Sequence, residues 1–213
     1  MEEQTVDQKG RPLGRRALET RRRLLNATAD LLAKRGLREI RVVEIARKVG
    51  TSPATFYQYF RDVEQATLAL AADAADQMPS LDEYFGEGWE DGRGMDAARG
   101  IVDAFIQHWD DHQAVLRIRN LAADEGEERF RRVRQRALRP ILDQFAAHIR
   151  EAQRQGRISR EINDYAAAAA LAAILERLAT YHSELESLGV TRRDLIETSA
   201  RILYQTLTGH SAP

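Results

Sequence analysis

The sequence contains no cysteine, which excludes disulfide bonds, thiolate metal ligands and cysteine nucleophiles. It also lacks any run of the roughly 18 consecutive apolar residues that a membrane-spanning helix needs. Its first 16 residues hold no apolar stretch of the kind found in secretory signals. We therefore expect a cytoplasmic protein with no membrane partner. Aromatic residues are also scarce, at 7%, so a local concentration of them calls for an explanation.

The formal net charge of −1 hides an uneven distribution of charge. Residues 1–61 hold 14 Lys and Arg against 7 Asp and Glu, so the rest of the chain carries the excess negative charge. A basic first third on an acidic body is typical of a protein that binds a polyanion at one end. A solvated basic face gives the same pattern, so charge alone leaves both interpretations open.

Hydrophobic periodicity predicts an all-α chain, because apolar residues recur at helical spacing and no alternating run indicates a strand. We expect three parts: a flexible basic arm over residues 1–16, a three-helix domain over 17–62 and a larger helical domain over 63–213. The expected helices cover residues 19–35, 42–49, a short segment that begins at 53, then 63–78, 95–111, 113–122, about 130–156, 164–189 and 192–208. A glycine-rich connection over 79–94 separates the fourth helix from the fifth.

The stretch TSPATFYQYF, residues 51–60, concentrates aromatic side chains directly after a glycine. Ser52 is placed to cap free backbone N–H groups, and Pro53 suits the first helical position because it has no N–H to lose. Two short helices joined by the turn VGTS form a helix-turn-helix. Similar helix pairs occur in enzymes, so this pattern alone does not decide the function.

The segment from Glu19 to Leu70 resembles the DNA-binding domain of the tetracycline-repressor (TetR) family along its whole length. The pieces that carry the resemblance are TRRRLLNATADLLAKRG, EIARKVG and TSPATFYQYF. The resemblance implies a homodimeric, ligand-responsive transcription regulator, more often a repressor, that binds a palindromic operator in double-stranded DNA and is released by a small-molecule effector. It implies no cofactor. A ligand-independent architectural protein or activator is the alternative.

The second helix of the helix-turn-helix is expected to enter the major groove. Phe56 and Phe60 should pack inward, while the exposed side contacts bases and phosphates. The resemblance places Tyr57 and Tyr59 at phosphate-contacting positions; a packed ring with an exposed hydroxyl is the alternative for both. It also places Arg15 and Arg16 where some members reach into a minor groove, and a disordered tail is the alternative there. The candidate DNA contacts are Arg15, Arg16, Arg41, Thr51, Ser52, Pro53, Ala54, Thr55, Tyr57, Gln58, Tyr59 and Arg61.

Three positions depart from the family pattern. The family commonly begins the second helix with Ser or Thr and has Arg two residues later, whereas this chain has Arg41 and Val43 there. We expect Arg41 to contact a phosphate instead. The lysine that usually follows the aromatic cluster is Val63 here, and Arg61 is the expected substitute.

The larger domain is expected to hold the effector and to form the dimer through the last two helices. The alanine run 166–173 fits a dimer seam, because small residues let another helix approach closely; internal packing is the alternative. The make-up of the expected pocket suggests a lipophilic or aromatic effector, although core packing also explains each aromatic residue. The candidate pocket residues are Trp89, Phe105, Trp109, Arg117, Asn120, Phe145, His148, Leu175 and Tyr181.

Signatures of catalysis are missing from the sequence. His108 and His112 have a spacing that suits zinc on one helix face, but no third ligand follows at a clear spacing, so we predict no metal. The Glu-x-x-His motif of di-iron bundles, a glycine-rich phosphate loop and a nucleophile elbow are all absent. We therefore expect a regulator and not an enzyme.

Overall fold

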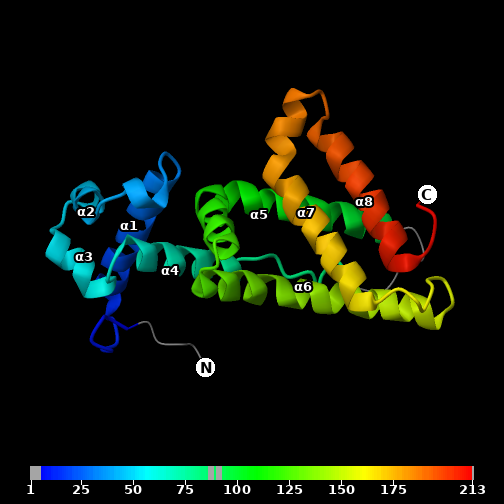
Figure 1. The fold of residues 1–213 in the computed structure, drawn as a ribbon, viewed down its shortest axis with the longest axis horizontal. Coiled ribbons are helices and arrows are strands. Elements are labelled where there is room, and N and C mark those ends of the chain that lie inside the picture. Colours follow the sequence, from blue (N-terminus) through cyan, green and yellow to red (C-terminus); the bar gives the residue numbers. More distant parts are fainter. Residues whose placement is uncertain (1–5, 86–88, 90–92, 213) are drawn as a thin grey trace. The chain divides into compact units, whose positions relative to one another are not determined.

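The structure is a computed structural model that describes residues 6–85, 89 and 93–212. Over these residues it holds helices and no strand, which confirms the all-α prediction (Figure 1). The helices are α1 Arg15–Leu32, the 3-10 helix η1 Leu37–Glu39, α2 Val42–Val49, α3 Pro53–Tyr59, α4 Val63–Asp76, α5 Arg93–Asp124, α6 Glu128–Arg154, α7 Asp164–Ser187 and α8 Arg192–Thr208. Within these residues, every helix is too short or too polar to cross a bilayer.

Two helices differ from the sequence-based expectation. Helix α1 begins at Arg15, directly after the extended residue Gly14, so the last part of the expected flexible arm is helical. Helix α5 is continuous from Arg93 to Asp124, where two separate helices were expected. The polar run DDHQ at residues 110–113 was taken for a break, but neither glycine nor proline lies near it, so nothing ends the helix there.

Tertiary contacts divide the chain into two compact units. The first joins Met1–Asp76 to His112–Arg134, and the second joins Gln77–Asp111 to Gln135–Pro213. This division by contacts differs from the expected division by function at residues 16 and 62, because α4 and the corner between α5 and α6 group with the helix-turn-helix. The functional domain boundaries stay a prediction.

The core of the first unit forms where α1, α2 and α3 meet. Leu24, Ile45 and Phe56 have no solvent-exposed surface and belong to one apolar cluster. The end of α2 is fixed by Gly50, whose left-handed backbone (φ 72°) closes the helix, and by the Arg23 guanidinium, which donates a 2.6 Å hydrogen bond to the Val49 carbonyl. Glycine suits this turn because other residues adopt positive φ at a cost. This turn sets the direction in which α3 leaves α2.

The core of the second unit is built from α5, α6, α7 and α8. Phe105, Phe145 and Leu203 are among its buried side chains. Between α5 and α8, the Arg99 guanidinium makes an ion pair with the Glu197 carboxylate at 2.7 Å. Helices α7 and α8 pack on each other within the chain.

Candidate nucleic-acid interface

Helix α3 is short and depends on its two ends. The Ser52 hydroxyl accepts a 3.3 Å hydrogen bond from the Thr55 N–H, and Pro53 occupies the first helical position, as predicted. Helix α3 ends at Tyr59, and the N–H of Phe60, the residue that follows, donates to the Phe56 carbonyl at 3.0 Å. A helix of seven residues is not stable alone in water, so α3 must be held by packing.

The two faces of α3 differ in burial. Phe56 and Phe60 are buried, with ring centroids 5.5 Å apart, and join the core cluster of the first unit. On the other side, Pro53, Ala54 and Gln58 are exposed, and the exposed fraction of Tyr57 is 52%. The expected split between an anchoring face and a free polar face is therefore present in the structure. The DNA contacts themselves stay predictions.

Three other candidates on this segment are only half-buried. The Tyr59 ring packs against the core cluster, so its hydroxyl is less available than that of Tyr57. The Thr55 hydroxyl lies 3.2 Å from that of Ser52, which ties both groups to the helix cap. Thr51 donates its N–H to the Ala46 carbonyl at 2.9 Å and continues the turn after α2. Burial thus favours Tyr57 over Tyr59 as the freely exposed aromatic donor.

The start of α2 shows how this chain works without the family's usual Ser or Thr. The Arg41 N–H donates a 3.0 Å hydrogen bond to the Glu44 carboxylate, which also pairs with Arg35 at 2.9 Å. The hydrogen bond from the Arg41 N–H holds the pKa of the Glu44 carboxyl below its usual value. Glu44 therefore caps the helix, and the exposed Arg41 side chain is left for another contact. Val43 is also exposed, at 55%.

The two positions at the start of α4 have different surroundings. Val63 is half-buried and packs on the core cluster, so its apolar character has a structural reason. Arg61 is exposed and makes a 3.0 Å ion pair with its neighbour Asp62. An Arg61 contact with phosphate would compete with this exposed pair, which is weak in water.

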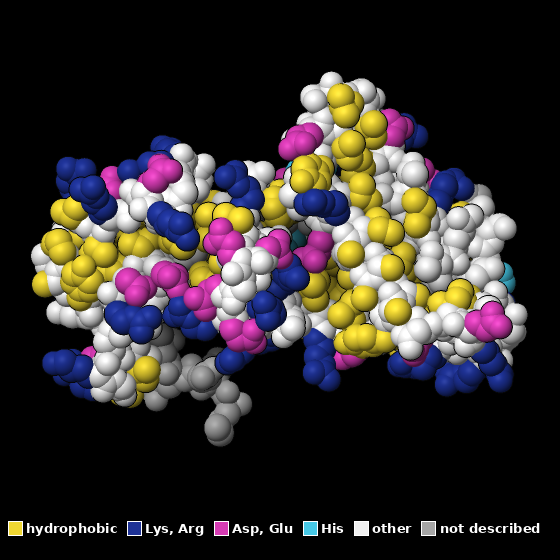
Figure 2. All heavy atoms as spheres, viewed as in Figure 1, with side chains coloured by type: hydrophobic (Ala, Val, Ile, Leu, Met, Phe, Trp, Pro, Cys, Tyr) yellow, Lys and Arg dark blue, Asp and Glu magenta, His cyan; other side chains and the backbone are white. Residues whose placement is uncertain are grey.

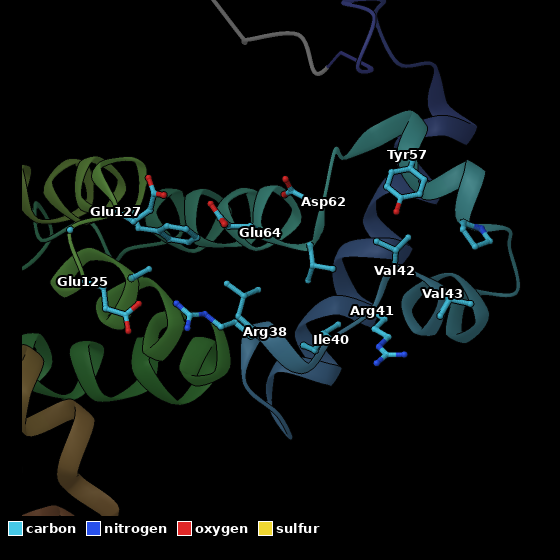
Figure 3. Close-up of a pocket in the computed structure, with 16 residues that line it drawn as sticks. Arg38, Ile40, Arg41, Val42, Val43, Tyr57, Asp62, Glu64, Glu125 and Glu127 are labelled. Carbon is cyan, nitrogen blue, oxygen red and sulfur yellow. The ribbon is translucent and has the colours of Figure 1, made fainter.

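A groove of about 970 Å³ lies on one side of Tyr57 and is lined by side chains of both charges. Its carboxylates are Asp62, Glu64, Glu125 and Glu127. Two basic side chains, Arg38 and Arg41, also line it. In Figure 3, Tyr57, Val42 and Arg38 lie across the opening from Glu64 and Glu127. We call it the mixed-charge groove: the Arg129 guanidinium pairs with both Glu64 and Glu127, and Arg61 pairs with Asp62, so three of its four carboxylates are compensated.

Residues 7–16 form more local structure than the sequence suggests. Arg15 and Arg16 are exposed in the first turn of α1, so neither belongs to an extended arm. Residues 7–12 form a turn that hydrogen-bonds to the end of α3. The sequence gives little sign of this contact, because its partners are about fifty positions apart along the chain.

Most candidate effector-binding residues lie inside the second unit. Trp89, Phe105, Trp109, Phe145 and Leu175 are buried there. His148 is half-buried, and burial lowers the pKa of its imidazole, which favours the neutral ring at pH 7. Their role as the lining of an effector pocket stays a prediction.

An aromatic cluster connects three of these candidates and adds a residue that the sequence analysis missed. The Phe85 ring stacks on Trp89 with centroids 5.3 Å apart, and it lies 4.3 Å from the His148 ring and 5.9 Å from Phe145. The Trp89 indole N–H donates to the Tyr84 carbonyl at 2.7 Å. Phe85 belongs to the irregular connection, where no periodicity marks an inward side chain.

The remaining pocket candidates lie elsewhere. Tyr181 is half-buried beneath the Arg177 guanidinium, 4.5 Å from its ring centroid. Arg117 is exposed and Asn120 accepts hydrogen bonds from Arg119, and both belong to the first unit. Their assignment to the effector pocket stays a prediction. Across residues 6–85, 89 and 93–212, no group of three or more His, Cys, Asp or Glu side chains is placed to hold a metal ion.

Comparison with known proteins identifies both parts of the chain. Residues 24–70 match the family described as bacterial regulatory proteins, tetR family. Residues 82–213 match the family described as tetracyclin repressor-like, C-terminal domain. An uncharacterized HTH-type transcriptional regulator of Bacillus subtilis (strain 168), YdgC, is 34% identical over 68 residues, which are 32% of this chain and 35% of that protein. That alignment thus spans about a third of the relative.

Solved structures share the fold over nearly the whole chain. The regulator FadR from Bacillus subtilis, in complex with stearoyl-CoA, has a TM-score of 0.62 at 15% identity, covering 89% of this chain and 98% of that one. The SmeT–triclosan complex has a TM-score of 0.61 at 16% identity, covering 89% and 90%. At these identities the likeness concerns the fold. With both of its domains matched, the chain belongs to the TetR family of transcriptional regulators.

Proposed function

We propose that this chain is a homodimeric, ligand-responsive transcription regulator, a repressor that binds a palindromic operator through α3 and is released by a small lipophilic or aromatic effector. The observation that carries the DNA-binding part is the division of α3 into a buried anchoring face and an exposed polar face. An exposed helix of this kind at the end of a helix-turn-helix fits the major groove. Tyr57, Gln58 and Ala54 are the side chains that we assign to the contact.

Homodimer formation is supported by a second apolar face on α7. One face of this helix is buried in the chain through residues such as Leu171 and Leu175. The other leaves Ile174 exposed at 41%, beside exposed alanines of the run 166–173. Figure 2 shows hydrophobic side chains gathered along α7 and the adjoining part of α8. Two copies joined through these helices would form a four-helix seam and place two α3 helices on successive half-sites, about 34 Å apart.

Effector binding is assigned to the apolar interior of the second unit. Large buried rings offer contacts to an apolar or aromatic molecule, and the neutral His148 ring offers a hydrogen bond without a charge. The related structures of FadR with stearoyl-CoA and of SmeT with triclosan contain ligands of apolar and aromatic character. We infer that a ligand shifts the population between DNA-binding and non-binding conformations.

Selection of bound fragments from genomic DNA tests this proposal. We expect enrichment of a sequence with two-fold symmetry, and release of the protein from it by a metabolite of the neighbouring genes. Failure to enrich any palindrome would refute the operator assignment. Enrichment without a releasing metabolite would instead support a ligand-independent architectural protein or activator.

A further inference from the structure

The turn of residues 7–12 lies beside the C-terminal end of α3 (Figure 1). Gln8 makes the contact between them. The Gln8 backbone N–H donates to the Gln58 carbonyl at 3.1 Å. Its side-chain amide donates to the Tyr59 carbonyl at 3.0 Å and lies 3.1 Å from the Gln65 side-chain oxygen. The last carbonyls of a helix have no partner within the helix. Gln8 therefore caps α3 from a distant part of the sequence.

The turn itself is pre-organised by Asp7. The Asp7 carboxylate accepts hydrogen bonds from the Lys9 N–H at 2.8 Å and the Arg11 N–H at 3.0 Å, and it pairs with the Arg11 guanidinium at 2.7 Å. Gly10 has φ 75°, a conformation that glycine adopts without strain. Because the local hydrogen bonds fix the turn, its basic side chains are presented in a defined place and not on a random coil.

A second groove, of about 730 Å³, lies between this turn and α3. Lys9 and Arg11 line it from the turn, whereas Ala54, Tyr57 and Gln58 line it from the helix. Tyr57 thus borders both this groove and the mixed-charge groove. Asp7 also lines this groove and compensates Arg11, which leaves the exposed Lys9 as the cation of the turn that can meet a phosphate. The Tyr57 side chain therefore lies at the border of the two grooves.

We propose that residues 7–12 form a second nucleic-acid contact element, in which Gln8 positions α3 and Lys9 contacts a DNA phosphate. The proposal rests on the proposed DNA-binding function. It differs from a minor-groove arm, because the element is folded and fixed to the recognition helix. In this proposal Lys9 contributes positive charge to the complex. Gln8 contributes no charge and affects DNA binding by holding the C-terminal end of α3 in place.

Salt dependence of operator binding separates these two roles. Each phosphate contact contributes about 0.9 to the slope of log affinity against log salt concentration. We expect Lys9→Ala to lower this slope by about 0.9 per protomer. Gln8→Ala should lower the affinity about fivefold, the value of one net hydrogen bond, and leave the slope unchanged. Lys34→Ala is the matched control, since it removes an exposed lysine that does not line the groove.

Hydrogen exchange of the full chain tests the capping role without DNA. Gln8→Ala should speed exchange of the last turn of α3 and leave α8 unchanged, whereas the Lys9 and Arg11 amides, which Asp7 holds, should change little. Unchanged exchange in α3 would overturn the positioning role. An equal slope change for Lys9→Ala and Lys34→Ala would overturn the phosphate contact. If the wild-type chain bound no DNA, the proposed function and the phosphate contact would both fail, whereas the exchange result would still decide whether Gln8 caps α3.

Discussion

Replacing two neighbouring aromatic residues of α3 by alanine should lower stability to very different extents. Phe56 is fully buried, so Phe56→Ala leaves a cavity and should lower the local free energy of unfolding by about 3–5 kcal/mol. Tyr57 is about half exposed and makes only an edge contact with Phe56, at 5.8 Å between centroids. Such an aromatic pair contributes about 0.5–1.5 kcal/mol, which limits the loss for Tyr57→Ala. The two variants should therefore differ by about 1.5–4.5 kcal/mol.

Native-state hydrogen exchange measures this difference where it arises. Both tryptophans, Trp89 and Trp109, belong to the second unit, so tryptophan fluorescence does not report directly on the first. We expect Phe56→Ala to accelerate exchange in α2 and α3 and to abolish DNA binding through loss of the helix. Tyr57→Ala should weaken DNA binding while exchange in α2 stays near that of the wild type. An equal loss of protection in the two variants would refute the division of α3 into two faces.

Three further predictions concern the turn, the histidine and the seam. A Cβ added by Gly50→Ala meets no atom within 4 Å, so the cost comes from its left-handed backbone. The free energy of unfolding of the first unit, measured by hydrogen exchange, should fall by about 1–2 kcal/mol. A fall well beyond this would reveal a packing role. Burial lowers the pKa of His148, so the unfolded chain binds the proton more tightly and the free energy of unfolding falls as the pH drops through about 6.5. His148→Phe should reduce this loss when thermal unfolding is compared at pH 7 and pH 5. An unchanged pH profile would argue against a role of His148 in it. Ile174→Glu should shift the chain to monomers in sedimentation equilibrium. The control Leu121→Glu alters an exposed leucine of the first unit and should leave the dimer intact. Equal behaviour of the two variants would contradict the α7 seam.

The sequence predicts helices well where caps and glycines mark their ends. The ranges of α2 and α8 match the prediction, and α3 begins at Pro53 as expected. The continuous helix α5 was missed because a polar surface stretch resembles a linker when only apolar spacing is considered. Polarity at residues 110–113 reflects the surface of a long helix and not its end.

The candidate interface was predictable on α3 but not beside it. Phe56 and Phe60 are buried as their spacing suggests, because residues four apart share one face of a helix. Half-burial of Tyr59 was not evident, since its ring turns toward the core of a domain whose packing the sequence does not show. Gln8 was missed for a related reason: an amide in a polar terminal stretch acquires its role only when folding brings the end of α3 to it.

The central claim is that α3 contacts bases of a two-fold symmetric site. Selection from randomised double-stranded DNA, run in parallel with the wild type, Gln58→Ala and Tyr57→Phe, tests this claim most directly. The wild type should enrich a palindrome, and Gln58→Ala should relax the base preference at symmetric positions of both half-sites. Tyr57→Phe should enrich the same sequence with weaker binding, because a phosphate contact carries no base information. A wild-type selection without symmetry, or an unchanged base preference for Gln58→Ala together with an altered one for Tyr57→Phe, would contradict this account.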